Sequence, residues 1–178
     1  MRIGSWIVIY VSLLVLFVAV VSDLCSGKIP NRWICVGFAA AGVLMVWPGL
    51  SFGWTGFLSG LAIPLLIGWI PFRMGALGAG DVKLMMVIGC LNGGREIIYC
   101  IFLSFLLAAG ISLGRLLSLR QFKNSLISCI RYFQGIFLQR KIALYPERGQ
   151  KGHTIHFSMA IFGGYVMWLG VNTCRFIL

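Results

Sequence analysis

The apolar positions of this chain gather in long runs, separated by short polar stretches. Five runs are close to the length of about 20 residues that a helix needs to cross a bilayer. They cover residues 3–21, 33–47, 51–72, 97–113 and 155–171, the second being a little short. A sixth run, residues 82–91, would cover only about half a bilayer as a helix. The pattern predicts a chain made of membrane-spanning helices.

The short sixth run has three readings that the pattern alone leaves open. It is a span that begins below the membrane surface, a re-entrant segment, or the first part of a bent helix that continues into residues 97–113. If it crosses, all but three of the 15 Lys and Arg fall on one side; the exceptions are Arg2, Arg95 and Arg175. Cytoplasmic loops collect Lys and Arg. This asymmetry favours six spans, with the basic side cytoplasmic and the N-terminus outside.

Composition supports the membrane assignment. The chain is 60% hydrophobic and 11% charged, whereas a soluble domain is about one quarter charged. We expect an all-α, polytopic protein of the cytoplasmic membrane, with residues 1–178 forming one membrane-embedded domain. The net charge of +11 follows from orientation in the bilayer. Nucleic acid is not expected as a partner, because a basic face on a soluble module is not visible.

Most of the net positive charge lies in residues 116–153. Within this stretch, apolar residues recur at steps of three and four; they are Phe122, Leu126, Ile130, Phe133 and Phe137. The spacing predicts an amphipathic cytoplasmic helix lying on the inner leaflet, and a solvated helix fits nearly as well. Arg131, in the middle of the stretch, argues against a seventh span.

The chain has only two aspartates, and each lies at the end of an apolar run. Asp23 occurs in "SDLCSGKIPNRW" and Asp81 in "GAGDVKLM", and the charge pattern puts both on the cytoplasmic side. Ionisable residues at membrane depth are candidates for function because burying them is costly. Two carboxylates brought together share a proton. Such a pair activates water for amide hydrolysis, one group taking a proton while the other holds the carbonyl oxygen.

The neighbours of the aspartates have structural and functional readings. Gly78 and Gly80 allow a close approach of backbone or unusual φ and ψ angles, although small residues also mark ordinary helix contacts. Pro30 fixes the chain where it enters the second span, and Asn31 suits the cap of that helix. For both we favour a structural turn over substrate contact. Lys83 is more readily a plain cytoplasmic charge than a group that tunes the pKa of a carboxylate.

No metal or cofactor is expected. His153 and His156 have a spacing that suits a pair of metal ligands, but a third ligand is not evident. We favour interfacial packing for these histidines. The six cysteines form no C-x-x-C pair, so a zinc or redox motif is not supported.

Two segments together resemble a known family. "DLCSGKIPN" (residues 23–31) and "GAGDVKL" (residues 78–84) are similar to the signature segments of the type IV prepilin peptidases. These are membrane aspartic proteases with a G-x-G-D motif. "IHFSMAIFGGY" (residues 155–165) loosely resembles the last span of that family. The G-x-G-D motif also occurs in presenilin-like proteases, and the Ile-Pro-Asn segment favours the prepilin branch.

The resemblance implies a specific activity. Asp23 and Asp81 would be the catalytic pair, and the substrates would be pilin-like precursors with a short basic leader, cut at the cytoplasmic face. Gly78, Gly80, Lys83, Pro30 and Asn31 would support the site. Longer bacterial members carry an N-terminal extension with paired C-x-x-C motifs and also methylate the product. Since this chain starts directly with its first span, the expectation is the short form without methyltransferase activity.

Two other classes of function use the same carboxylates. A proton- or cation-coupled carrier subunit would place them deep within spans, often with inverted repeats. Here both acids lie at span ends and no repeat is visible, which favours the peptidase. In a purely structural assembly subunit, the aspartates would only cap helices near the surface.

Overall fold

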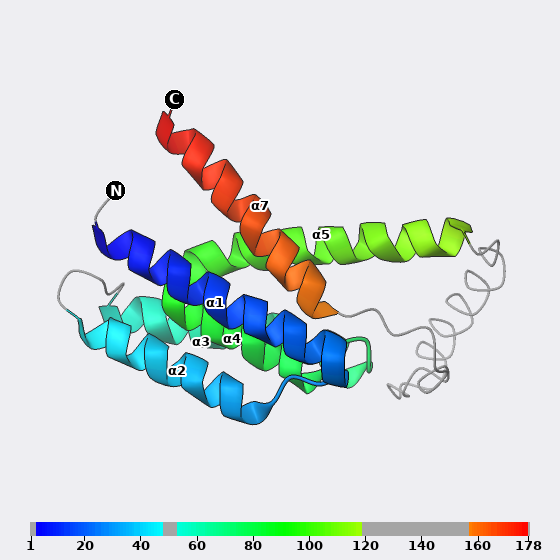
Figure 1. Cartoon of the computed structure of the whole chain (residues 1–178), viewed down its shortest axis with the longest axis horizontal. Coiled ribbons are helices and arrows are strands. Elements are labelled where there is room, and N and C mark those ends of the chain that lie inside the picture. The colour runs from blue at the N-terminus through cyan, green and yellow to red at the C-terminus, as the bar shows by residue number, and fades with distance from the viewer. Residues whose placement is uncertain (1–2, 48–52, 119–156, 178) are drawn as a thin grey trace.

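The computed structural model describes residues 3–47, 53–118 and 157–177, and in this part of the chain all regular structure is helical. Its helices are α1 (Ile3–Ser26), α2 (Asn31–Val46), α3 (Gly53–Arg73), α4 (Ala79–Asn92), α5 (Gly94–Ser118) and α7 (Phe157–Ile177) (Figure 1). The all-α class predicted from the apolar runs is confirmed.

Three of these helices are long and apolar enough to cross a membrane. The qualifying segments are Trp6–Ser26, Gly53–Arg73 and Gly94–Gly114, and shorter apolar helices occupy Asn31–Val46 and Phe157–Asn172. A helix of 14 residues such as α4 is about 21 Å long, less than the roughly 30 Å of the hydrocarbon core. The chain is therefore a polytopic membrane protein with one helix too short to span a bilayer by itself.

Successive helices run in alternating directions (Figure 1). α1, α3 and α5 point one way, while α2, α4 and α7 return. The connections α1–α2 and α3–α4 therefore lie at the same end of the bundle, where α5 also ends and α7 begins. The distribution of Lys and Arg over two sides requires helices of alternating direction, and the fold has them.

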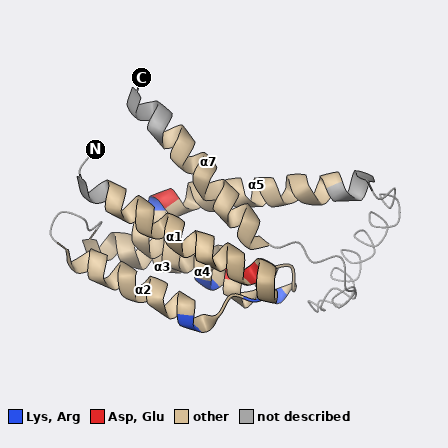
Figure 2. Ribbon diagram, viewed as in Figure 1, with Lys and Arg blue, Asp and Glu red and all other residues tan. Residues whose placement is uncertain are grey.

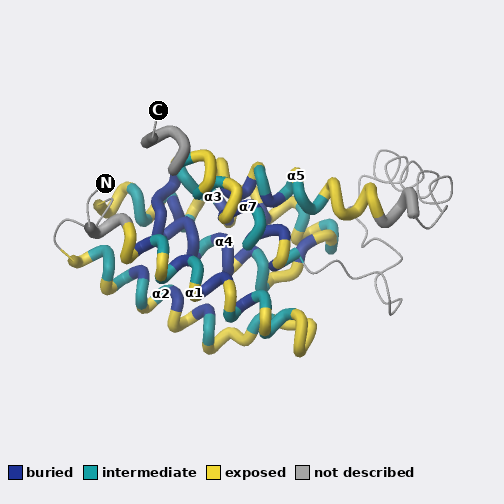
Figure 3. The backbone as a smooth tube through the Cα atoms, turned by 45° about the horizontal axis from the view of Figure 1, so that its top comes forward, coloured by how far each residue is buried: buried dark blue, intermediate teal, exposed yellow. Residues whose placement is uncertain are grey.

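The short helix α4 occupies the centre of the bundle. It packs against all five other described helices, and its tube is dark blue over much of its length in Figure 3. Its buried residues are Val82, Leu84, Met85, Val87, Ile88, Gly89, Cys90, Leu91 and Asn92. A helix that is apolar on all sides is an interior helix. This explains why the sequence there shows a short run without an amphipathic stripe.

Glycines bring α3 and α4 into backbone contact. A Cβ atom added at Gly60 would overlap the backbone of Gly89, and one added at Gly89 would overlap the backbone of Gly60. Further along the same pair of helices, a Cβ on Gly68 would lie 3.1 Å from the side chain of Val82. Small residues drive helix association in lipid because they let backbones approach closely. The glycines of α3 therefore favour close packing against α4.

Most helices extend a few residues beyond the apolar runs that predicted them, and two of these differences are informative. The apolar run ends at Val21, but α1 continues to Ser26, so that Asp23 belongs to the helix and not to the following connection. The helix ends where the Gly27 N–H donates to the Asp23 carbonyl oxygen at 2.7 Å, with Gly27 at a φ of 64°. The other difference is α5, which runs to Ser118 instead of ending at Leu113. Hydropathy indicates only the part of a helix that contacts lipid. The helix itself continues as long as its backbone hydrogen bonds do, including through polar residues.

The rest of the expected basic amphipathic segment, together with His153 and His156, lies outside the described residues.

The glycine contact between α3 and α4 predicts a strong effect of one added methyl group. Gly60→Ala should lower the free energy of unfolding by about 1–3 kcal/mol, because overpacking against the backbone of Gly89 forces the helices apart. Gly42→Ala is the matched control, since no atom lies within 4 Å of the added Cβ at that helical glycine. Thermal unfolding in detergent measures both. Equal melting temperatures for the two variants would contradict the packing described.

Candidate functional site

Asp23 and Asp81 lie at the same end of the bundle on two helices that pack together. Asp23 is in the last turn of α1, and Asp81 is in the first turn of α4. These helix ends are adjacent to the α1–α2 and α3–α4 connections (Figure 1), and acidic and basic positions are marked at this end in Figure 2. Both aspartates are half-buried. The shared end predicted from the sequence is thus present in the fold.

Each aspartate stands at the end of a buried stripe of its helix. On α1 the stripe is formed, at steps of four, three and four residues, by Ser12, Leu16, Ala19 and Asp23. On α4 the same steps give Asp81, Met85, Ile88 and Asn92. All members except the aspartates are buried. Residues at these steps share one face of a helix, so each carboxylate continues a face that is packed inside the protein.

One partner of Asp23 comes from α7. The Ser158 hydroxyl donates to Oδ2 of Asp23 at 2.6 Å, and Ser158 is fully buried. Short O–H···O⁻ bonds of this length are typical of a charged acceptor. Ser158 was not singled out from the sequence. The available signal was a hydroxyl residue at the start of the last apolar run, inside the loosely matching "IHFSMAIFGGY".

Asp81 interacts with the turn that precedes its own helix. Its Oδ2 accepts a hydrogen bond from the Gly78 N–H at 3.3 Å, and its own N–H donates to the Gly78 carbonyl at 3.2 Å. An acid in the first turn also interacts favourably with the helix dipole. Asp81 is the third residue of α4, and its carboxylate bonds back to the N-cap residue Gly78, which stabilises the start of the helix.

The two glycines of the G-x-G-D motif serve different purposes. Gly78 has an ordinary extended conformation, with φ −77° and ψ 148°, so unusual backbone angles do not explain it. A Cβ there would lie 3.0 Å from Oδ2 of Asp81, and its absence leaves room for the carboxylate. At Gly80 a Cβ would lie 3.3 Å from Cβ of Ile29. The close approach expected at Gly80 is present, and its neighbour is the α1–α2 connection.

The start of α2 differs from the prediction. Pro30, with φ −64° and ψ 131°, is the N-cap residue, and the helix begins at Asn31 without a side-chain cap. The capping role predicted for Asn31 is wrong, because a residue already inside the first turn does not occupy the position from which a cap reaches the N–H groups beyond it. Instead its Oδ1 accepts a hydrogen bond from Nζ of Lys83 at 3.1 Å. Lys83 thereby joins α4 to α2.

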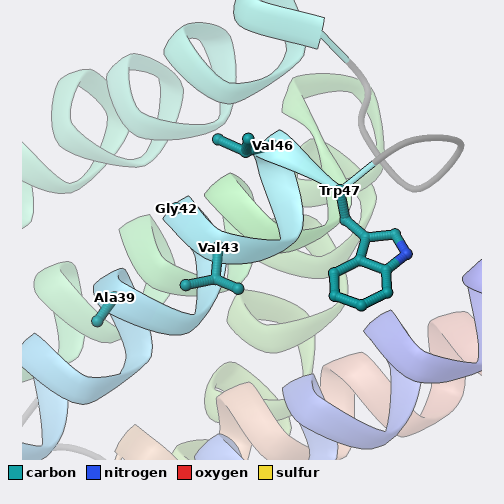
Figure 4. Close-up of a pocket in the computed structure, with 5 residues that line it drawn as sticks. All are labelled: Ala39, Gly42, Val43, Val46 and Trp47. Carbon is teal, nitrogen blue, oxygen red and sulfur yellow. The ribbon is translucent and has the colours of Figure 1, made fainter.

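An apolar hollow of about 570 Å³ lies on the second half of α2, lined by Ala39, Gly42, Val43, Val46 and Trp47 (Figure 4). Because α2 begins beside the aspartates, this hollow lies toward the opposite end of the bundle. Its lining side chains supply no acid, base or nucleophile. Over the described ranges, there is no group of three or more His, Cys, Asp or Glu side chains able to hold a metal ion.

Comparison with known families identifies the chain. The sequence model of the type IV leader peptidase family matches residues 10–113. This chain belongs to that family. The matched range contains both aspartates, the α1–α2 connection and the G-x-G-D motif, while Ser158 lies beyond it. Searches of curated proteins and of solved structures returned no match.

Membership in the leader peptidase family confirms the resemblance seen in the two signature segments and makes the chain a membrane protein of a peptidase family. It gives no support to the carrier reading.

The bond between Lys83 and Asn31 predicts a local effect at the start of α4. Lys83→Met should speed amide hydrogen exchange over residues 79–84 by about two- to fivefold, the effect of losing one exposed hydrogen bond to a charged donor. Asn31→Ala should do the same, and the double variant should exchange no faster than either single variant, because both remove one bond. Mass spectrometry of the exchanged peptides measures this.

Lys28→Met is the control, since Lys28 is an exposed lysine of the α1–α2 connection. If it speeds exchange as much as Lys83→Met, or if the two single effects add, the bond does not hold α4 in place.

Proposed function

We propose that this member of the leader peptidase family is an aspartic endopeptidase in which Asp23 and Asp81 activate a water molecule. The observation that carries the proposal is the position of two half-buried carboxylates at one end of the bundle, on packed helices, inside the matched range. The substrates proposed are type IV prepilin-like precursors. The enzyme would remove their short basic leader at the cytoplasmic face of the cytoplasmic membrane, an orientation that the excess of Lys and Arg in the connections at this end supports.

The chemistry follows from two acids that share one proton. The ionised carboxylate takes a proton from the water as its oxygen attacks the scissile carbonyl carbon. The protonated carboxyl donates a hydrogen bond to the carbonyl oxygen, on which negative charge develops. Collapse of the tetrahedral intermediate breaks the C–N bond, and the departing amine receives a proton from the pair.

The surroundings support this role by orienting each acid. Ser158 fixes one oxygen of Asp23, and the Gly78 N–H contacts one oxygen of Asp81. Catalytic groups need rotamers that are held by neighbours before the substrate arrives. Substrate would then complete the geometry, as in many enzymes whose catalytic hydrogen bonds tighten only in the complex.

The alternatives fit the arrangement less well. A proton carrier needs its carboxylates along a path through the span, whereas both aspartates here lie at helix ends on one side of the bundle. The capping contact of Asp81 is compatible with catalysis, since it involves one oxygen and the N-terminus of a helix.

Replacing either aspartate by its amide tests the proposal directly. Asp23→Asn and Asp81→Asn should each lower the rate of leader removal by at least about a hundredfold, because the amide neither accepts nor shares the proton. Both proteins should still insert and accumulate. Cleavage of a leader-bearing prepilin peptide in detergent is the assay.

Glu96→Gln is the matched control, an acid-to-amide change in α5 at the other end of the bundle, where Oε2 accepts from Trp168 Nε1 at 3.1 Å. It should leave cleavage intact. Cleavage at the normal rate by either Asp→Asn variant would end the proposal.

The contact between Ser158 and Asp23 predicts a smaller effect. Ser158→Ala should lower kcat by about 10- to 100-fold, because hydrogen bonds to charged groups contribute about 1.5–3 kcal/mol and each 1.4 kcal/mol is about tenfold in rate. Ser158→Thr keeps the hydroxyl and should recover most of the rate. The measurement is kcat for the same peptide with purified variants.

Ser104→Ala provides the comparison, since Ser104 is buried and its hydroxyl donates to the Cys100 carbonyl of its own helix at 2.7 Å. Equal losses in Ser104→Ala and Ser158→Ala would show that the effect comes from a buried hydroxyl in general and not from the contact with Asp23.

A further inference from the structure

A cluster of buried polar side chains joins α1, α4 and α7 well away from the aspartates. Nδ2 of Asn92 donates to Ser12 Oγ at 3.0 Å and to the Ile88 carbonyl at 3.0 Å, while the Tyr165 hydroxyl donates to Asn92 Oδ1 at 3.1 Å. Ser12, Asn92 and Tyr165, called the Asn92 cluster below, are 0%, 5% and 1% exposed. The proposed chemistry uses none of them. A buried amide with this many partners strongly favours one arrangement of its helices, because leaving it unpaired is costly.

The spacing along α1 and α4 connects this cluster to the aspartates. Ser12 precedes Asp23 by 11 residues, and Asn92 follows Asp81 by 11 residues. Eleven residues make three turns plus about 20°, and a rise of about 16 Å. Each aspartate therefore shares a helix face with one member of the cluster and lies about three turns from it.

Because α1 and α4 are antiparallel, the equal spacing places Asp23 and Asp81 at the same position along the bundle axis. α1 and α4 run in opposite directions (Figure 1), so moving from Ser12 toward Asp23 and from Asn92 toward Asp81 is movement the same way along the bundle. A hydrogen bond between Ser12 and Asn92 consequently sets the two aspartates level with one another. It also fixes which faces of α1 and α4 meet.

Helix α7 forms a hydrogen bond at the level of Asp23 and another at the level of Asn92. Ser158 and Tyr165 are seven residues apart on α7, which is two turns less about 20°. Ser158 bonds to Asp23, and Tyr165 bonds to Asn92. One face of α7 therefore contacts the aspartate level with one residue and the Asn92 cluster with the other.

We propose that the Asn92 cluster fixes the axial register of α1, α4 and α7, and that Asn92 is a positioning residue for the aspartate pair. The inference rests on the proposed function. Between the two levels lie only apolar contacts on the facing stripes, namely Leu16, Ala19, Met85 and Ile88. Apolar packing is not directional, and a buried Asn is known to fix register where apolar contacts alone do not.

A slip in register would be felt at the catalytic end. One residue of slip displaces a carboxylate by about 1.5 Å and turns it by about 100°. Misplacement of about 1 Å in a catalytic group is enough to lower a rate by on the order of a hundredfold. The Asn92 cluster thus acts on the reaction from a distance of about three helical turns, without touching substrate.

The test compares kcat, KM and the pH dependence of kcat, using a leader-bearing peptide and purified full-length protein in detergent. Asn92→Leu keeps the size of the side chain and removes its hydrogen bonds. Its kcat should fall by about 10- to 100-fold, with KM changed by less than about twofold. Two acids that share one proton give a bell-shaped dependence of kcat on pH, whose width reflects the interaction between them. In Asn92→Leu this profile should become narrower by on the order of half a pH unit, because carboxylates that are no longer held at the same height interact less.

The width of the pH profile distinguishes a misplaced aspartate pair from a loss of folded enzyme. A variant that only contains less folded protein has a lower kcat at every pH, and the width of its pH profile is unchanged. Ser12→Ala and Tyr165→Phe each remove one hydroxyl of the Asn92 cluster with little change in side-chain volume, and they should lower kcat by at least about threefold with the same narrowing of the pH profile. They decide the matter if Asn92→Leu does not accumulate. Ser104→Ala, which removes a buried hydroxyl bonded within α5, should keep the normal width.

The outcomes are distinct from those for the proposed function. If the unmodified protein does not cleave the peptide, or if Asp23→Asn and Asp81→Asn cleave it normally, the proposed function falls and this inference falls with it. If those variants are inactive but the variants of the Asn92 cluster match the unmodified protein in kcat and profile width, only the positioning role is overturned. Narrowing in Ser104→Ala equal to that in the cluster variants would also overturn it.

Discussion

The backbone contact between Gly60 and Gly89 is the constraint on which the rest of the fold depends. It draws α3 so close to α4 that a helix of only 14 residues is enclosed by its neighbours. Because all five other described helices then pack around α4, its polar residues can lie in the interior with protein partners. The position of Asp81 at one end of α4 and of Asn92 at the other follows from this enclosure.

The arrangement of the candidate site depends on how the interior helix α4 begins. α4 starts at Ala79 after an extended Gly78, and its first turn packs against the α1–α2 connection through Gly80 and Ile29. The two signature segments, which are separated by some fifty residues of sequence, are thereby parts of one surface. Each residue type in the G-x-G-D motif has a local reason, since a side chain on either glycine would meet the carboxylate or the connection.

Hydropathy predicted the helices because lipid contact demands continuous apolar length, and charge asymmetry predicted that Asp23 and Asp81 share an end. Features set by contacts between distant residues could not be predicted in this way. Ser158 was missed because its hydroxyl matters only where α7 meets α1. Asn31 was assigned a cap from its residue type, while its actual partner is Lys83 on another helix. The first helix was predicted over residues 3–21, whereas α1 continues to Ser26, because the apolar run ends before the backbone hydrogen bonds do.

The link between α1 and α7 at Ser158 and Asp23 determines which parts of the bundle can move independently. Asp81 lies on α4, which is in backbone contact with α3 at Gly60 and Gly89. A displacement of α4 therefore requires α3 to move with it. Asp23 belongs to α1, which Ser158 couples to α7, and neither of those helices shares such a backbone contact with α4. A Cβ on Gly164 of α7 would overlap the backbone of Ser104 in α5, so a change in the distance between the two acids would require α1 to tilt together with α7 and α5 against the α3–α4 pair. With a lever arm of about 16 Å, a tilt of a few degrees moves a carboxylate by about 1 Å, so a small tilt is enough to change the distance between the two acids of the proposed pair.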